Sequence, residues 1–153
     1  MAVAVGRKVP DFTASSTGGD VKLSALKGRK VVLFFYPKDN TPGCTSESSD
    51  FRDRNDAFEK AGAVILGISR DSLKSHDGFK KKLGMPFELV SDPDEALCTL
   101  FEVIRMKNMY GKQVRGIERS TFVIDAAGKL AREWRGVKVA GHADEVLECV
   151  QSL

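Results

Sequence analysis

The chain has 153 residues, 42% of them apolar and 29% charged, a balance typical of a soluble globular protein with one domain, residues 1–153. Its net charge of +3 is small and evenly spread, which argues against nucleic-acid binding. The longest purely apolar run, residues 31–36, is far shorter than the roughly 20 residues that cross a bilayer, so we expect no membrane association. Arg7 and Lys8 precede a proline rather than an apolar signal segment, which favours a cytoplasmic location.

The predicted elements alternate between strands and helices. In chain order they are an extended pair at 10–23, a strand at 31–36, a helix at 42–61, a strand at 63–69, a helix at 72–83, a strand at 87–90, a short helix at 94–101, an irregular stretch at 102–117, a hairpin at 121–134 and a helix at 142–152. Helices between buried strands imply βαβ units and a parallel core sheet. We therefore expect an α/β fold, a mixed sheet with helices on both faces.

One segment, residues 36–47, has the features of a reactive site. It starts at the carboxyl end of the first buried strand, where open α/β sheets bind ligands. Thr41 is a good N-cap and Pro42 a good first helical residue, so Cys44 falls in the first turn of the following helix. This placement predicts a thiol that faces the positive end of a helix dipole.

The helix dipole alone does not make a thiol reactive. An ordinary thiol with a pKa of about 8.5 is only about 3% thiolate at pH 7, and 90% ionisation needs a shift of roughly 3.4 kcal/mol. A helix N-terminus contributes about 0.3–1 kcal/mol, occasionally about 2 kcal/mol. The Thr41 hydroxyl can supply one hydrogen bond, and a cation must come from elsewhere in the chain.

The motif Pro37-x-x-x-Thr41-x-x-Cys44 resembles the signature of peroxiredoxins. The string 35–45, Phe-Tyr-Pro-Lys-Asp-Asn-Thr-Pro-Gly-Cys-Thr, is similar to the bacterioferritin comigratory protein, or Q-type, branch. Further segments resemble the same branch in the same order, at residues 9–12, 67–71, 90–94, 109–112 and 119–125. The resemblance therefore covers nearly the whole chain.

This resemblance implies a thioredoxin-like fold with an N-terminal hairpin extension and a thiol-dependent peroxidase that reduces hydrogen peroxide and organic hydroperoxides. It implies that Cys44 is oxidised to a sulfenic acid, that Arg119 is the missing cation, and that Pro37 shields the sulfur. Glu47, one turn after the cysteine, is placed to orient Arg119 through a bidentate pair. No metal and no cofactor is expected, and no dinucleotide motif is present.

The chain departs from many members of the branch where they carry a second, resolving cysteine. Ser49 stands at one such position, and residues 79–82 contain no cysteine. The remaining cysteines, Cys98 and Cys149, lie among apolar neighbours, where packing is the favoured interpretation. We therefore expect a one-cysteine mechanism in which thioredoxin, or glutathione with glutaredoxin, is the reductant of a monomer or weak dimer.

Alternative interpretations remain open at this point. They are a two-cysteine route through Cys98, a redox-sensing or holdase role, and a thiol–disulfide oxidoreductase, although the last normally needs a CxxC pair. For His76 and His142, surface or capping positions are favoured over catalysis. Met106, Met109 and Tyr110 are either core fillers or an apolar rim for organic hydroperoxides.

Overall fold

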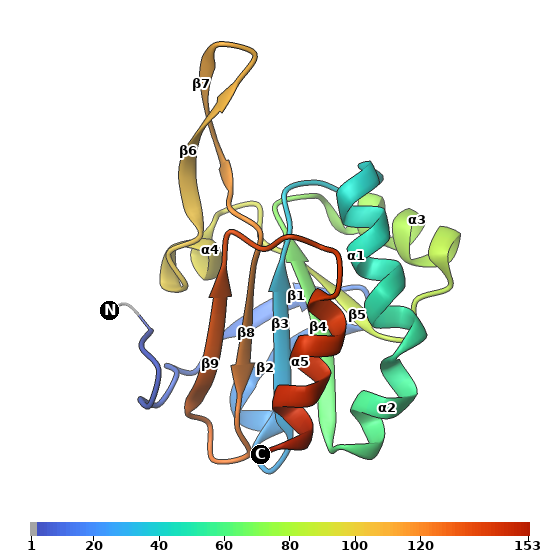
Figure 1. The fold of residues 1–153 in the computed structure, drawn as a ribbon, viewed down its shortest axis with the longest axis vertical. Coiled ribbons are helices and arrows are strands. Elements are labelled where there is room, and N and C mark those ends of the chain that lie inside the picture. The colour runs from blue at the N-terminus through green and yellow to red at the C-terminus, as the bar shows by residue number, and fades with distance from the viewer. Residues whose placement is uncertain (1–2) are drawn as a thin grey trace.

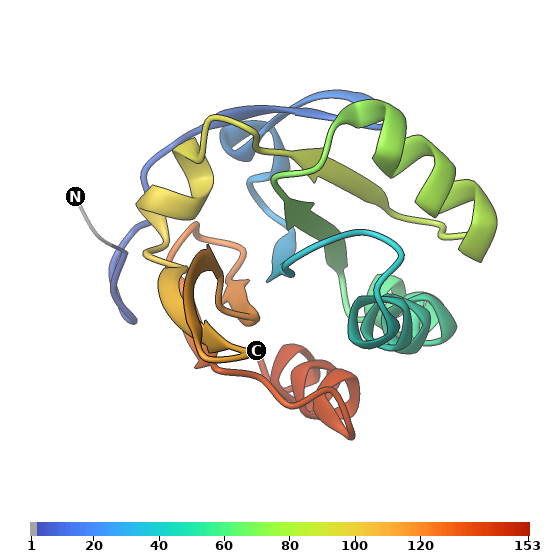
Figure 2. The same cartoon turned by 90° about the horizontal axis from the view of Figure 1, so that it is seen from above.

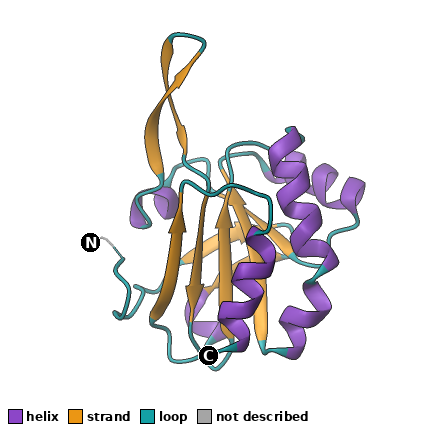
Figure 3. Ribbon diagram, viewed as in Figure 1, coloured by secondary structure: helices purple, strands orange, loops and turns teal. Residues whose placement is uncertain are grey.

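The computed structural model describes residues 3–153, without the side chain of Met109, and is built around one seven-stranded mixed sheet (Figures 1 and 3). The strand order is β2-β1-β5-β4-β3-β8-β9. The strands of this sheet are β1 Thr13–Ser16, β2 Gly19–Lys22, β3 Lys30–Phe35, β4 Ala63–Ser69, β5 Glu88–Ser91, β8 Ser120–Ile124 and β9 Leu130–Arg135. The helices are the 3-10 turn η1 Leu23–Leu26, then α1 Pro42–Asp53, α2 Asn55–Lys60, α3 Leu73–Leu83, α4 Ala96–Leu100 and α5 His142–Gln151.

The centre of the sheet is parallel and its margins are antiparallel. β3 pairs with β4 and β4 with β5 in parallel, whereas β8 runs antiparallel to β3 and β1 runs antiparallel to β5. The hairpin β1–β2 thus extends the sheet at one edge. It is the N-terminal hairpin extension that was predicted from the sequence. The prediction of a thioredoxin-like α/β fold is confirmed.

Strand β3 separates two apolar cores because its side chains point alternately to opposite faces. Val32 and Phe34 belong to the core covered by α1, α2, α3 and α5, whereas Val31, Leu33 and Phe35 belong to the core covered by α4 and η1. Seen from above, the helices lie on both sides of the sheet (Figure 2). This burial on both faces explains why the run reads as continuously apolar in the sequence.

The helix predicted at 42–61 is divided in two. The backbone of Arg54 (φ −106°, ψ 3°) separates α1 from α2, and its guanidinium Nε lies 2.6 Å from Asp144 Oδ1 on α5. The bend leaves Phe51 of α1 and Phe58 of α2 in the same core, with ring centroids 5.8 Å apart. The apolar spacing that suggested one helix therefore reflects two short helices with a shared buried face.

The stretch predicted to be irregular, residues 102–117, is a β-hairpin, so that prediction is wrong. Strands β6 Ile104–Met109 and β7 Lys112–Ile117 pair only with each other and stand out from the body of the protein (Figure 1). Tyr110 and Gly111 form a two-residue turn with positive φ at both positions, 53° and 80°. Met106 is 60% exposed and Tyr110 fully exposed, so neither is a core filler.

In the part of the chain from residue 3 onward, no helix is both long enough and apolar enough to cross a membrane.

Candidate active site

Cys44 lies in the first turn of α1, directly beyond the carboxyl end of β3. Thr41 has the extended backbone of an N-cap (φ −81°, ψ 153°), and Pro42 is the first helical residue, where its missing N–H costs no hydrogen bond. The Cys44 side chain packs into the core between α1 and the sheet and is only 1% exposed. The sulfur thus faces a helix N-terminus in a nearly enclosed position.

Arg119 reaches the same point from β8, the strand next to β3. β8 runs antiparallel to β3 with Ser120 opposite Phe35, so the residue before β8 lies beside the carboxyl end of β3. Its Nη2 atom lies 3.3 Å from Cys44 Sγ, and its Nη1 donates to Glu47 Oε1 at 2.7 Å. The fold therefore brings the Arg119 guanidinium to a sulfur and a carboxylate that lie more than 70 residues earlier in the chain.

Burial and charge act in opposite directions on the pKa values of Glu47 and Arg119. Burial raises the pKa of Glu47 to about 7, although the Arg119 charge opposes this shift. Only one carboxylate oxygen is paired, and Oε2 is buried without a hydrogen-bond partner among the described residues. The predicted bidentate contact is therefore a single hydrogen bond. Burial lowers the pKa of Arg119, but the charges of Glu47 and Cys44 outweigh it and the net shift is upward.

Thr41 and Pro37 lie in the loop that connects β3 to α1. The Thr41 hydroxyl donates to the Lys38 carbonyl at 2.8 Å, so in this structure it is engaged within the loop rather than on the sulfur. Its side chain also makes no capping hydrogen bond to the helix. Pro37 is half-buried directly after Tyr36, the last residue of the apolar run.

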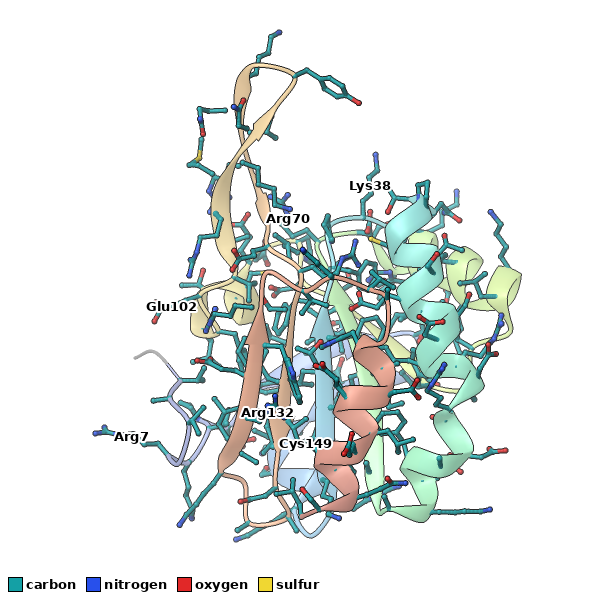
Figure 4. The ribbon with its side chains drawn as sticks, in the orientation of Figure 1. Arg7, Lys38, Arg70, Glu102, Arg132 and Cys149 are labelled. Atoms are coloured by element: carbon teal, nitrogen blue, oxygen red, sulfur yellow. The ribbon has the colours of Figure 1, made fainter. Side chains whose placement is uncertain are left out.

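The two other cysteines lie away from Cys44. Cys98 is fully buried on α4 and belongs to the core on the opposite face of the sheet from Cys44. Burial and the neighbouring Asp92 raise its pKa. Cys149 is half-buried near the end of α5, toward the other end of the sheet from Lys38 (Figure 4).

A second cation, Lys107, is electrostatically coupled to Arg119 and Cys44 and was not predicted from the sequence. Lys107 on β6 donates to the carbonyl of Ile117. Burial and the charge of Arg119 lower its pKa, and the charge of Cys44 acts in the opposite direction. Lys107 lies in residues 102–117, which were predicted to be irregular, so its position could not be inferred.

Both histidines are buried, so the prediction of surface positions is wrong. His76 is 0% exposed and His142 is 4% exposed. The Nε2 atom of His142 lies 2.7 Å from the Thr121 hydroxyl on β8, and burial lowers the pKa of this histidine to about 4. The apolar spacing of Phe79 with His76 on α3 was the available signal, since a histidine on the apolar face of a helix is buried with its neighbours.

Comparison with known proteins places this geometry in a family. Residues 5–133 match the model of the AhpC/TSA family. The chain is 57% identical over 143 residues to the peroxiredoxin Bcp of Xanthomonas campestris, covering 93% of this chain and 89% of that protein. It is 46% identical over 154 residues to the peroxiredoxin Bcp of Bacillus subtilis, covering 100% of this chain and 98% of the relative.

Solved structures agree with the sequence comparison. A structure of the Xanthomonas campestris bacterioferritin comigratory protein, described in terms of its alkyl peroxide reduction activity, aligns with a TM-score of 0.90 at 52% identity, covering 97% of this chain and 98% of that one. A PrxQ mutant from Xylella fastidiosa aligns with a TM-score of 0.93 at 43% identity, covering 99% and 98%. The resemblance inferred from the sequence is confirmed: the chain belongs to the AhpC/TSA family and is a peroxiredoxin of the Bcp, or Q-type, branch.

Proposed function

We propose that this peroxiredoxin reduces hydrogen peroxide and organic hydroperoxides through Cys44 and needs no second cysteine of its own. The observation that carries the site assignment is the 3.3 Å contact between Arg119 Nη2 and Cys44 Sγ. A guanidinium keeps its charge at all relevant pH values and offers several donors in a fixed plane. It is therefore suited to hold both a thiolate and an oxygen that gains negative charge.

In the proposed step, the Cys44 thiolate attacks the terminal oxygen of the hydroperoxide. A sulfur–oxygen bond forms, the O–O bond breaks, and sulfur is oxidised by two electrons to a sulfenic acid. The departing alkoxide, or hydroxide from hydrogen peroxide, takes a proton and leaves as alcohol or water. Arg119 stabilises the oxygen charge that develops in the transition state, and Glu47 holds the guanidinium in place.

Thr41 and Pro37 complete the proposed site. The Thr41 hydroxyl turns from the Lys38 carbonyl toward the peroxide when substrate is bound, since a hydroxyl rotor changes partner at low cost. Pro37 covers the sulfur without offering a donor of its own. The Xanthomonas campestris relative is described by its alkyl peroxide reduction, which supports organic hydroperoxides as substrates here.

The placement of the cysteines supports an external reductant. Cys44 and Cys98 belong to cores on opposite faces of the sheet, and a disulfide needs Cα atoms within about 7 Å. Burial also disfavours the Cys98 thiolate, which is the form that attacks. A thiol from thioredoxin, or from glutathione with glutaredoxin, therefore attacks the sulfenic acid, releases water and forms a mixed disulfide. A second thiol then restores Cys44.

The proposal is tested with two variants and with mass spectrometry of the oxidised protein. Cys44→Ser should lose peroxidase turnover, whereas the double variant Cys98→Ser/Cys149→Ser should keep the parent rate with at least one of the two reductant systems. Mass spectrometry after one equivalent of peroxide should find oxygen on the peptide that contains Cys44. Turnover lost in the double variant, together with a Cys44–Cys98 disulfide peptide in the oxidised parent, would replace the one-cysteine route with an intramolecular one.

A further inference from the structure

A buried polar cluster links the loop that carries Pro37 and Thr41 to α3 and to the residues at the end of β4. The Asp39 cluster, as we call it, consists of Tyr36, Asp39, Ser69, Asp71, Ser75 and His76. Tyr36 and His76 are fully buried and Asp39 is 4% exposed. None of these side chains has a role in the steps proposed above, and buried titratable groups are retained only where hydrogen bonds and charge partners stabilise them.

The two acceptors that face the ring nitrogens of His76 favour an imidazolium ring. Its Nε2 atom lies 2.9 Å from the Val90 carbonyl, which only accepts, so Nε2 carries a proton. Its Nδ1 atom lies 2.8 Å from Asp39 Oδ2. A neutral ring would then direct a lone pair at a carboxylate oxygen, whereas an imidazolium donates from both nitrogens.

Asp39 is in turn surrounded by donors. Tyr36 Oη donates to Oδ1 at 2.6 Å and Ser75 Oγ to Oδ2 at 2.8 Å, in addition to His76. Burial raises the pKa of Asp39, but the hydrogen bonds from His76 and Tyr36 outweigh it and the net shift is downward. The geometry therefore corresponds to an imidazolium–carboxylate pair in the protein interior.

The pair helps to fix the position of the loop between β3 and α1. The backbone N–H of Asp39 donates to Asp71 Oδ2 at 2.9 Å, which fixes the main chain at this point. The next residue, Asn40, has φ +65°, a left-handed conformation that asparagine adopts more readily than most residues with a Cβ. Thr41 follows directly and begins α1. Without the anchor at Asp39, the main chain of the loop loses this fixed point, and Thr41, two residues later, can shift with it.

A metal ion is the other chemistry that this cluster suggests, since ligand atoms of Asp39, Asp71 and His76 all lie within 4.8 Å of one another. The hydrogen bonds argue against it. Both nitrogens of His76 and both oxygens of Asp39 are already paired, and Asp71 Oδ2 accepts from Ser69 Oγ. A cation would have to displace these donors, so hydrogen bonds already satisfy the atoms that could bind a metal.

We propose that Asp39 and His76 are positioning residues for the peroxide step: their buried ion pair sets the course of the loop that presents Pro37 and Thr41 to Cys44. This inference rests on the proposed roles of Pro37 and Thr41. It assigns His76 a protonated resting state and gives the cluster an indirect role, through the loop and not through contact with the peroxide.

The first test needs no activity measurement, and its only variant serves to assign signals. The chain has 2 histidines, so ¹⁵N spectra of histidine-labelled protein at pH 7 show two rings, and a His142→Gln variant assigns them. We expect the imidazolium signature for His76 and a neutral ring for His142, whose pKa is lowered to about 4 by burial. A neutral His76 ring, or one whose signal changes on addition of Zn²⁺ alone, overturns the inference.

The second test measures the peroxide step in rapid-mixing experiments with Asp39→Asn, His76→Gln and the double variant. Misplacing reacting groups by about 1 Å costs up to about 100-fold, so we expect single variants 10- to 100-fold slower in oxidation of Cys44. Because the two residues act as one pair, the double variant should be no slower than either single variant. Reduction of the oxidised enzyme by dithiothreitol should stay within about twofold of the parent.

The matched control is Asp92→Asn. Asp92 is another buried carboxylate, 5% exposed, which accepts from the N–H groups of Leu97 and Cys98 at the start of α4. This variant should lose stability and keep the parent peroxide rate. Parent-like peroxide rates in the Asp39 and His76 variants, with Cys44→Ser inactive, refute the positioning role and leave the proposed function intact. An active Cys44→Ser enzyme would instead refute the function.

Discussion

At the scale of single residues, the proposed chemistry of Cys44 depends on Arg119 and Glu47. The guanidinium contacts the sulfur with one nitrogen and the carboxylate with the other. This arrangement holds the guanidinium before substrate arrives, so little reorganisation is needed as the oxygen gains charge. In the proposed mechanism, Arg119 acts on the transition state as well as on the sulfur before reaction.

Replacement of Arg119 separates these two effects. In Arg119→Ala we expect the second-order rate with peroxide to fall by about 100- to 1,000-fold, the usual loss for one preorganised donor. The thiolate fraction, measured by its ultraviolet absorbance, should fall by much less. Arg54→Ala, which removes an exposed ion pair to Asp144, is the control and should keep the parent rate. A rate loss equal to the loss of thiolate would contradict a transition-state role.

Gly43 is adjacent to Cys44, and its lack of a side chain leaves room for the guanidinium. A Cβ at this position would lie 3.1 Å from Arg119 Nη2. Gly43→Ala should therefore displace the guanidinium and slow the peroxide step by about tenfold, as expected for a small misplacement. Gly78→Ala on α3, where a Cβ meets nothing within 4 Å, should leave the rate unchanged and stabilise the helix slightly. Equal rates for both variants would show that Arg119 tolerates the shift.

At the scale of elements, the sequence patterns predicted those strands and helices whose residues are buried in the core. Strands β3 and β4 were predicted from continuous apolar runs, and the start of α1 from Thr41 and Pro42. The hairpin β6–β7 was missed because its exposed strands have no buried face to impose an alternating pattern. The break at Arg54 was missed because both halves of the interrupted helix bury the same core face.

The sequence also could not predict contacts that depend on tertiary packing. The motif alone points to Cys44, and the position of Arg119 came from family resemblance, since the β3–β8 register is not visible in the chain. The pairing of Asp39 with His76 joins residues 37 positions apart and has no local signature.

Gly67 in the middle of β4 is required by the packing of the sheet. A Cβ there would lie 2.8 Å from both Leu89 Cδ2 and Phe34 Cζ, two fully buried groups. Overpacking of this kind costs about 1–3 kcal/mol, so Gly67→Ala should lower the free energy of unfolding by that amount in urea titration. Gly116→Ala on β7 is the control, because the nearest atom to its Cβ is 3.8 Å away on Arg70. A stable Gly67→Ala protein would mean that Phe34 has room to move.

At the scale of the whole molecule, two buried groups make stability depend on pH in opposite directions. Burial raises the pKa of Glu47 from 4.5 to about 7, so its folded form holds a proton that the unfolded chain has released. Stability from Glu47 is thus lost as pH rises from 4.5 to about 7. Burial lowers the pKa of His142 from 6.5 to about 4, so stability is lost as pH falls through that window.

These two slopes overlap between pH 4.5 and 6.5 and should largely cancel in the parent protein. Each variant should then expose the slope of the remaining group. In Glu47→Gln the free energy of unfolding should rise with pH across this window, and in His142→Gln it should fall, each relative to the parent and by at most about 1.4 kcal/mol per pH unit. Urea unfolding at half-unit steps of pH measures all three proteins, and groups common to them cancel in the differences. Identical pH dependence in the parent and Glu47→Gln would show that Glu47 is ionised throughout the window and that its pair with Arg119 outweighs the cost of burial.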